Sequence, residues 1–598
     1  MPTAPVPARV VPFLLGMGAV GLLLAAGGLG LTIGIASYSQ LQKLGHLVYH
    51  EYQFKTLRLA LTPARLTLLR ALLAGAGVVG MVSLVFLHRT GGHLGSLRNE
   101  VLLGRKHFTS WLRRQPRWEQ YWALGLLVVL LGTRLWYLVS YPLSTDEIAS
   151  YDFFAKQGPL TVGTFYPIPN NHIFYNLLAW PLAASGLPAL IAMRLPGLLL
   201  GLGGTVLGYV LLARLAGARL ALAVMGLVGL APLWVYYAVA GRGYYLQICC
   251  LQIGFFAVIE LLKPNSRYVR LAWLAFVVGS VVGLYCVPSY AYPLVSLGAG
   301  IGVGFVWQRR WRALGHLLVA TTVVALLTAL LYTPVGLVSG WDRLLHNPYI
   351  AAKTPAEFWP SYRAFLYETA ATLFGPTLRL SGPAWLTMAV AGGIFSCYWL
   401  KKSSFAQHTA AQLAALMLLI PLLLMMLQRV YAPSRVLLYL TYFGYLLVGI
   451  WLRKLPFRKL IPARWQSPLL LLIVLGIGGF RLYENQAQVR TLQHETYQIA
   501  AAYHWLRAQP ATPGHPNRVW LHAIFHELFF AHYEQQEPPA QRDQLISHPA
   551  AASGGYDYLI IGRRPEDRKI VAPPNYWPRY HDDLVTIYQL SPSRPAHR

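Results

Sequence analysis

Charged residues are scarce in this chain. Asp, Glu, Lys and Arg make up 12% of its 598 residues, which is about half of their share in a soluble globular protein. Apolar residues make up 56%, and the mean hydropathy is +0.44. The composition therefore excludes an ordinary water-soluble protein, and the aromatic content of 13% excludes a disordered one.

Cysteine is also rare. The four cysteines all lie within apolar runs, at Cys249, Cys250, Cys286 and Cys397. They imply no disulfide framework, and no pair has the spacing of metal ligands with other donors nearby. We interpret them as small packed side chains.

Acidic residues are the scarcest charged group. The last 115 residues, 484–598, hold 11 acids and 11 bases, which leaves 10 of the 21 acids and 39 of the 50 bases for the first 483 residues. Those bases lie in short clusters between apolar runs. Nucleic-acid binding is one interpretation of the excess, but the positive-inside rule explains the clusters better. We therefore predict a membrane protein without a nucleic-acid partner.

Thirteen apolar runs are candidate membrane spans. The odd number places the two termini on opposite sides, and the even-numbered connections are rich in Lys and Arg, which places them in the cytoplasm. The first run is too long for a signal peptide, and no small-residue cleavage site follows it. The predicted spans are 11–36, 66–88, 121–141, 190–213, 220–239, 244–262, 271–288, 290–307, 313–338, 383–400, 409–427, 433–452 and 467–482.

The predicted fold is a polytopic α-helical protein of the inner (plasma) membrane, with a small C-terminal α/β domain on the outer face. Residues 1–119 form two N-terminal spans and a basic cytoplasmic connection, and residues 120–483 form the main membrane domain with outer loops 142–189 and 339–382. Residues 484–598 form the outer domain, with a helix at Ala487–Ala508 and strands at Arg518–His522, Tyr556–Gly562 and Leu584–Leu590.

An acidic cluster follows the third predicted span on the outer face. Asp146, Glu147 and Asp152 are three of the ten acids in the membrane part. One interpretation is a solvated helix start, with Thr145 or Asp146 as the N-cap. Capping explains one or two acids, however, and ionisable groups are expensive near a bilayer. A functional role is the better hypothesis.

The next outer segment holds Asn170, Asn171 and His172 after two prolines. Asn and His supply donors and acceptors that can orient sugar hydroxyls or phosphate oxygens. A turn followed by a helix cap is the alternative explanation.

Several basic residues are predicted on the outer face, where the positive-inside rule disfavours them. Arg242 and Tyr244 join spans five and six, Arg429 and Arg435 join spans eleven and twelve, and Arg194 lies near the outer start of span four. These arginines could extend to lipid headgroups. They could also bind a phosphate in a bidentate manner.

Together these motifs resemble the C-type glycosyltransferase superfamily, and within it the protein-mannosyltransferase and aminoarabinose-transferase group. The resemblance covers roughly residues 120–482 and rests on an acidic pair after a membrane helix, an outer loop with Asn, His and Pro, an Arg-x-Tyr loop and a late outer segment from Arg429 to Arg435. The Asn170-Asn171-His172 triplet departs from the more usual form of the loop motif. No counterpart in the superfamily is identified for the two N-terminal spans.

The resemblance implies a glycosyltransferase that takes a sugar from a polyprenyl-phosphate donor on the outer face and passes it to a lipid, glycan or protein acceptor. Independently, attack at an anomeric carbon needs a base near the nucleophile and cationic donors that stabilise the departing phosphate. We predict an inverting enzyme with Asp146 as the base. The predicted catalytic residues are Asp146 and Glu147, and the predicted substrate-binding residues are Asp152, Asn170, Asn171, His172, Arg194, Arg242, Tyr244, Arg429 and Arg435.

No cofactor is predicted, although the sequence leaves a divalent metal open. His522, His526 and His532 lie close together, but Glu527 follows the second His, so there is no HExxH motif. Membrane lipids are expected partners. The alternative functions are a lipid or solute transporter, for which we find no internal repeat, and a non-catalytic envelope assembly protein.

The predicted number of spans can be tested with a fusion protein. A reporter enzyme that is active only in the cytoplasm, fused after Arg598, is expected to be silent because thirteen spans place the C-terminus outside. Strong reporter activity would show that a span was miscounted.

Overall fold

The structure is a computed structural model, and helices make up most of it. The residues that it describes are 10–46, 58–89, 93–346, 350–375, 391, 404–453, 462–510, 516–522, 524–538, 541–547, 555–563 and 570–591. Apart from Ala391, the predicted span 383–400 lies outside the described residues.

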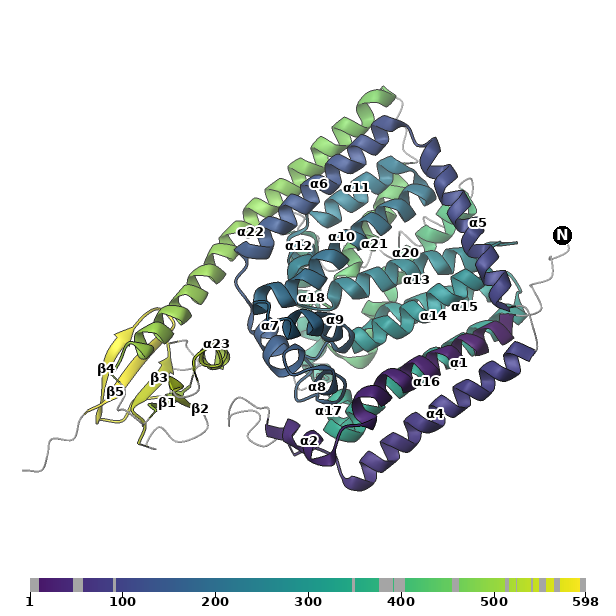
Figure 1. Cartoon of the computed structure of the whole chain (residues 1–598). Helices are drawn as coiled ribbons and strands as arrows, with labels where there is room; N and C mark the ends of the chain where they lie inside the picture. Colours follow the sequence, from purple (N-terminus) through teal and green to yellow (C-terminus); the bar gives the residue numbers. More distant parts are fainter. Residues whose placement is uncertain are drawn as a thin grey trace, which may run out of the picture.

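Long apolar helices pack side by side in one bundle (Figure 1). Within the described residues, ten helices are long and apolar enough to cross a membrane, and α11 with α12 adds an eleventh span that bends by 76°. The predicted polytopic helical fold is confirmed. The bundle helices are α1 (Val10–Leu29), α4 (Pro63–Arg89), α6 (Arg117–Ser140), α10 (Ala189–Ala216), α11 (Ala218–Gly229), α12 (Pro232–Val239), α13 (Tyr244–Leu262), α14 (Val269–Cys286), α15 (Ala291–Trp307), α16 (Trp311–Val335), α20 (Phe405–Gln428), α21 (Tyr439–Leu452) and α22 (Ala463–Arg507).

Two predicted spans differ in form from a straight helix. The fifth, 220–239, is the bent pair, because Pro232 cannot continue α11 but suits the first turn of a new helix. The twelfth, 433–452, is helical only over Tyr439–Leu452, and residues 434–438 form turns. The thirteen predicted spans thus correspond to the ten long helices, the bent pair, the shorter helix α21 and the run 383–400, of which only Ala391 is described.

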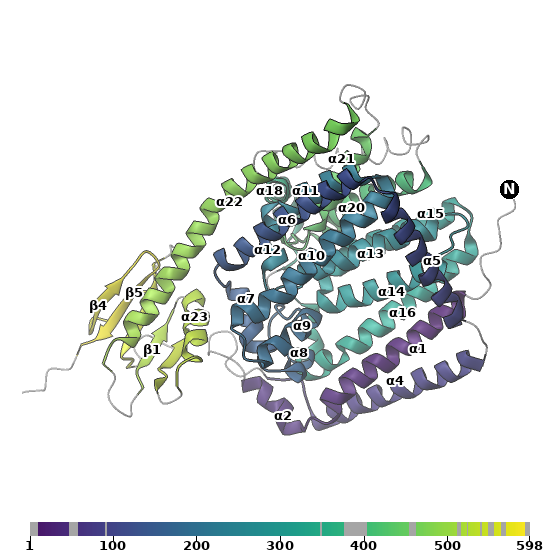
Figure 2. The same cartoon turned by 45° about the horizontal axis from the view of Figure 1, so that its top comes forward.

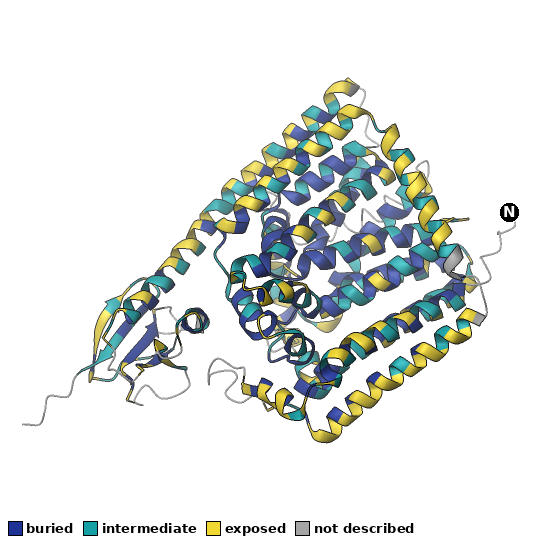
Figure 3. Ribbon diagram, viewed as in Figure 1, coloured by how far each residue is buried: buried dark blue, intermediate teal, exposed yellow. Residues whose placement is uncertain are grey.

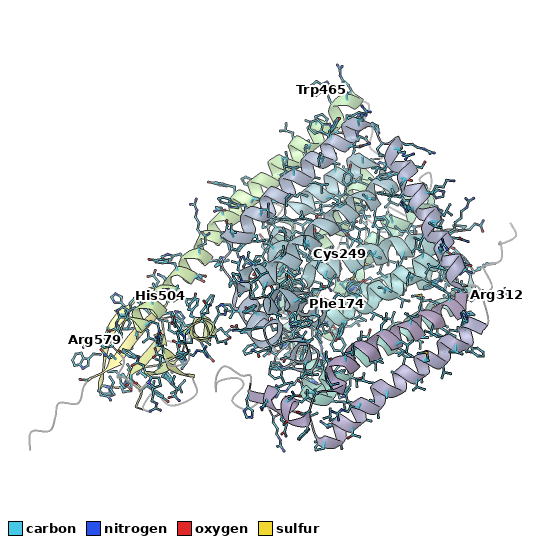
Figure 4. The ribbon with its side chains drawn as sticks, in the orientation of Figure 1. Phe174, Cys249, Arg312, Trp465, His504 and Arg579 are labelled. Carbon is cyan, nitrogen blue, oxygen red and sulfur yellow. The ribbon has the colours of Figure 1, made fainter. Side chains whose placement is uncertain are left out.

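The two ends of the bundle differ. The amphipathic helix α5 (His93–Arg114) crosses one end between α4 and α6, and Arg312 lies at the same end (Figures 1 and 4). The C-terminal sheet lies beyond the opposite end, where His504 and Arg579 are found (Figure 4). We call these the far end and the domain end.

The 45-residue helix α22 joins the two regions. It begins at the far end, runs along the bundle and continues beyond the domain end into the C-terminal domain (Figure 2). The predicted helix 487–508 is its last part, and the predicted boundary after residue 483 falls inside this continuous helix.

A five-stranded mixed sheet forms the C-terminal domain, in the order β2-β1-β3-β5-β4. Strand β1 is parallel to β2 and β3, and β5 is antiparallel to β3 and β4. The strand predictions are confirmed for β1, β3 and β5, whereas the two edge strands were not predicted. The strands are β1 (Arg518–Leu521), β2 (Gln544–Ser547), β3 (Tyr558–Gly562), β4 (Tyr576–His581) and β5 (Val585–Leu590).

Side chains of the sheet alternate between two apolar clusters. Tyr558 and Ile560 pack with the end of α22 and with α23 (Ile524–Glu534), whereas Leu559 and Ile561 pack on the opposite face. Helices therefore cover one face of the sheet, and α23 faces the bundle (Figures 1 and 2).

Short helices fill the domain end of the bundle. The predicted outer loop 142–189 forms α7 (Thr145–Ser150), the π-helix η3 (Tyr151–Ala155), α8 (Pro159–Thr164) and α9 (Ile173–Ala184). The other short elements are η1 (Gly30–Gly34), α2 (Tyr38–Lys43), η2 (Leu44–His46), η4 (Pro288–Tyr290), η5 (Gly336–Gly340) and α17 (Trp341–Leu345). The 20-residue helix α18 (Pro355–Phe374) follows α17.

Helix α10 packs closely on its neighbours through glycine. A Cβ on Gly201 would lie 3.0 Å from the Ala238 Cβ of α12, whereas one on Gly203 would meet nothing within 4 Å. Small residues allow membrane helices to approach in this way. Burial follows the same arrangement, because the central α13 is largely buried and the peripheral α4 is largely exposed (Figure 3).

The glycine contact predicts an asymmetric effect of substitution. Gly201→Val is expected to destabilise the protein by about 1–3 kcal/mol because it overpacks the α10–α12 contact. Gly203→Val, on the same helix, is the matched control and should leave the thermal unfolding midpoint in detergent unchanged. Equal effects of the two substitutions would contradict this packing.

Candidate active site at the domain end

Helix α7 starts with a capping box. The Ser144 Oγ accepts the Glu147 N–H at 3.3 Å, and Glu147 Oε2 accepts the Ser144 N–H at 3.1 Å. The Ser-x-x-Glu spacing produces this reciprocal pair. The N-cap is therefore Ser144, and not Thr145 or Asp146 as in the alternative capping interpretation, because only Ser144 of the three lies three residues before a glutamate.

A buried ion pair connects α7 to α10. Arg194 Nε and Nη2 donate to the two oxygens of Glu147, each at 2.8 Å, and both side chains are fully buried. Nη1 donates to the carbonyls of Leu138 and Tyr141, and Nη2 also donates to that of Pro142. All five N–H donors of Arg194 are thus engaged. This geometry favours a structural role for the pair, rather than contact with substrate.

The ionisation of Glu147 follows from the same contacts. Burial alone would raise the pKa of this carboxyl, but the charge and hydrogen bonds of Arg194, with the N–H groups of Gly241 and Ser144, hold the pKa below its ordinary value. Glu147 is therefore a carboxylate at neutral pH.

The Gly241–Arg242–Gly243 turn packs against α9, α10 and α14. A Cβ on Gly241 would lie 2.6 Å from the Met193 Cβ, and one on Gly243 would lie 2.2 Å from the Cys286 Sγ. Only glycine fits at either position, and the turn fixes Arg242 between them. Arg242 Nη1 donates to the Ser150 Oγ at 2.7 Å and to the Asn170 carbonyl at 3.0 Å.

His172 lies against this turn. Its Nδ1 accepts the Gly243 N–H at 2.9 Å, and its Nε2 lies 3.1 Å from Arg242 Nη2. Burial, and then the charges of Arg242 and Arg435, hold the pKa of His172 well below its ordinary value. The His172 ring is therefore neutral, and each of its nitrogens lies within hydrogen-bond distance of an N–H group, from Gly243 or from Arg242.

Asp146 is the exposed carboxylate of the cluster. Its side chain is 46% exposed, and Oδ2 lies 3.8 Å from Arg242 Nη2. Arg435, from the turn between α20 and α21, is exposed and hydrogen-bonds the side chain of Tyr244. The Tyr244 ring packs edge-on against His172, with the centroids 4.8 Å apart. Asp146, His172, Arg242, Tyr244 and Arg435 therefore come together from separate parts of the chain.

The other predicted site residues lie outside this cluster or support it. Asn170 Nδ2 donates to the Asp146 carbonyl, and Asn171 Nδ2 donates to the carbonyls of Val162 and Phe165. Asn170 thus holds the backbone at Asp146, and Asn171 holds the backbone in and after α8.

Asp152 and Arg429 point elsewhere. Asp152 is buried against the C-terminal domain, with Oδ2 2.8 Å from His532 Nδ1. Arg429 ends α20 in a left-handed conformation, with φ 52°. No contact that we find among the described residues joins its guanidinium to the cluster.

Two contributors were not identified as site residues from the sequence. Ser150 supplies the hydroxyl that holds Arg242, and His532 was considered only as a metal ligand. Neither contact has a local sequence signal, since the partners are 92 and 380 residues apart. Within the described residues, no group of three or more His, Cys, Asp or Glu side chains could hold a metal ion.

The overall fold is similar to that of a solved structure. The crystal structure of ArnT from Cupriavidus metallidurans bound to undecaprenyl phosphate superposes with a TM-score of 0.51 at 15% identity, and the match covers 78% of this chain and 97% of that one. The chain therefore shares the overall fold of this protein. The sequence-based resemblance is thereby confirmed at the level of the fold.

Two further solved structures match at lower scores. Apo ArnT from the same organism matches with a TM-score of 0.44 at 15% identity, over 78% of this chain and 98% of that one. The arabinosyltransferase EmbB from Mycobacterium smegmatis matches with a TM-score of 0.35 at 15% identity, over 73% of this chain and 45% of that one. No protein-family model and no curated protein sequence matches this chain.

The buried ion pair of Glu147 and Arg194 predicts a large effect on stability. Glu147→Gln keeps the volume but leaves Arg194 buried without its counter-charge, so we expect a loss of about 3–5 kcal/mol. Because the pKa of Glu147 is lower in the folded protein than in the unfolded chain, its contribution is present at neutral pH and lost as the pH falls through the folded-state pKa.

Thermal unfolding in detergent at neutral pH measures this effect. Asp146→Asn, one residue away on the same helix and half exposed, should leave the unfolding midpoint nearly unchanged. A Glu147→Gln variant as stable as wild type would refute the structural assignment.

Proposed function

We propose that this chain is a membrane glycosyltransferase that moves a sugar from a polyprenyl-phosphate donor to an acceptor, with Asp146 as the base. The observation that carries the proposal is the half-exposed Asp146 carboxylate beside two guanidinium groups and a neutral His172. A carboxylate next to a group of cationic donors suits glycosyl transfer from a phosphate.

The proposed phosphate site consists of Arg242, His172 and Arg435. Arg242 and His172 lie in contact beside Asp146, and a phosphate oxygen bound at this place would accept from the Arg242 guanidinium. Arg435 is exposed at the same place and adds a second positive charge. Glu147 and Arg194 neutralise each other, so they do not offset this charge.

The proposed reaction is a single displacement. Asp146 takes the proton of the acceptor hydroxyl or amine, the acceptor atom forms a bond to the anomeric carbon, and the bond from that carbon to the phosphate oxygen breaks. The electron pair leaves with the polyprenyl phosphate, whose charge Arg242 and Arg435 stabilise. Glu147 is not available as a second, nucleophilic carboxylate, because Arg194 holds both of its oxygens. Inversion at the anomeric carbon follows.

The lipid nature of the donor and the side of the membrane on which the site lies are supported by separate observations. ArnT, which this fold resembles, was solved with undecaprenyl phosphate. The far end holds the basic residues of α5 and Arg312 (Figure 4). Arg270, which pairs with Glu100 of α5, and Arg219, which donates to Ser467 near the start of α22, belong to the same end. The positive-inside rule assigns this end to the cytoplasm. The proposed site and the C-terminal domain therefore face the outer, periplasmic side of the inner membrane, and the acceptor is a lipid, glycan or protein that is accessible there.

Binding of undecaprenyl phosphate tests the phosphate site. Arg435→Gln removes the charge and the fork geometry of the guanidinium, so the affinity should fall about ten- to a hundredfold. Arg363→Gln is the matched control, since Arg363 is an exposed arginine of α18. Native mass spectrometry of the purified proteins with the lipid measures both.

Sugar transfer tests the base. Asp146→Asn should bind undecaprenyl phosphate as wild type does, whereas transfer from radiolabelled polyprenyl-phosphate pentoses or hexoses should drop at least about a hundredfold. A wild-type protein that does not bind the lipid would overturn the proposal, and so would an Asp146→Asn variant with full transfer.

A further inference from the structure

The C-terminal domain docks directly on the segment that carries Asp146. Helix α23 lies on the side of the domain that faces the bundle, next to α7 (Figures 1 and 2). Helix α22 links the domain covalently to the bundle. The contact between α23 and α7 joins the domain to the short helices of the domain end.

A buried hydrogen bond lies at the centre of the contact. Asp152 Oδ2 is 2.8 Å from His532 Nδ1, and the two residues are only 3% and 6% exposed. Among the described residues we find no other hydrogen-bond partner for the Asp152 carboxylate, and its Oδ1 is buried. Loss of His532 would thus leave a buried carboxylate unsatisfied, which is costly enough to move the segment.

Neighbouring contacts extend the interface on both sides. Ile148 of α7 is 1% exposed and belongs to the apolar core of the C-terminal domain. The Tyr151 ring packs edge-on against His532, and Lys156 Nζ donates to the Gln535 Oε1 at 3.3 Å.

Successive residues of this segment serve different partners. Asp146 faces Arg242, Glu147 binds Arg194, Ile148 enters the C-terminal domain, and Ser150 holds Arg242. Helix α7 is short, so it cannot move relative to α23 without moving the Asp146 carboxylate in its first turn. The position of Asp146 is therefore coupled mechanically to the docking of the domain.

We propose that His532 is a positioning residue, which acts through Asp152 to hold α7 and η3 so that Asp146 faces the donor phosphate. This inference rests on the proposed function for its catalytic consequence. It assigns the C-terminal domain a role in transfer, although none of its residues belongs to the proposed phosphate site.

Two variants, His532→Asn and His532→Gln, distinguish the effect of the hydrogen bond to Asp152 from the effect of side-chain size and polarity. The amide nitrogen of Asn lies near the position of Nδ1 and can donate to Asp152, whereas the amide nitrogen of Gln lies near that of Nε2 and cannot. Both are made in the full-length protein. His581→Gln is the matched control, because His581 is an exposed histidine of β4 in the same domain.

Hydrogen exchange of residues 145–155 is the first measurement. In His532→Gln we expect these amides to exchange at least about tenfold faster, with strands β3 and β5 unchanged, because the contact opens locally. His532→Asn and His581→Gln should resemble wild type. Faster exchange throughout the sheet, or equal effects of Asn and Gln, would overturn the proposal.

Transfer kinetics and lipid binding are the second measurement. His532→Gln should lower kcat about ten- to a hundredfold, because a small displacement of the base is sufficient for that loss. Its affinity for undecaprenyl phosphate should stay within about twofold, since the phosphate site is separate, and His532→Asn should restore kcat. An unchanged kcat in His532→Gln would overturn the positioning role.

A double substitution keeps the test decisive if His532→Gln alone is not recovered in folded form. Asp152→Asn with His532→Asn retains a neutral amide pair and should fold and transfer, while Asp152→Ala should lose kcat as His532→Gln does, because the two residues act as one unit. Local exchange changes without any sugar transfer in the wild type would refute the proposed function but not the positioning of α7.

Discussion

The buried ion pair of Glu147 and Arg194 is the constraint on which the site depends. The last carbonyls of a helix lack partners within that helix. Arg194 donates to the carbonyls of Leu138 and Tyr141 at the end of α6, and it also binds Glu147 in the first turn of α7. Glu147 also accepts the Gly241 N–H, so the same carboxylate positions the turn that carries Arg242. Three segments that are distant in the sequence thus meet at one carboxylate.

That arrangement explains how one short helix combines structural and chemical roles. Asp146 and Glu147 are adjacent, yet one is half exposed and the other fully buried, because successive side chains of a helix point about 100° apart. The same division occurs elsewhere in the site. Asn171 holds the backbone while its neighbour His172 faces Arg242, and the two glycines of the Arg242 turn supply space rather than chemistry.

Much of the membrane architecture was predictable from residue patterns. Apolar runs and basic clusters depend on the bilayer, which acts on each segment independently. The positions of the spans could therefore be read without knowledge of their neighbours, and the confirmed strands β1, β3 and β5 have strong local signals. The bend between α11 and α12, the short α21 and the edge strands β2 and β4 were missed, because packing and pairing decide them.

The sequence by itself determined that the chain crosses a membrane many times, that acids and arginines gather near one face, and that their motifs resemble the C-type glycosyltransferases. Tertiary structure alone decided which member of each motif is free for chemistry. Arg194 and Glu147 neutralise each other, Asp152 pairs with His532 from 380 residues away, and Asp146 stays half exposed beside Arg242. These roles depend on distances between segments far apart in the chain, and such distances leave no periodicity or spacing in the sequence.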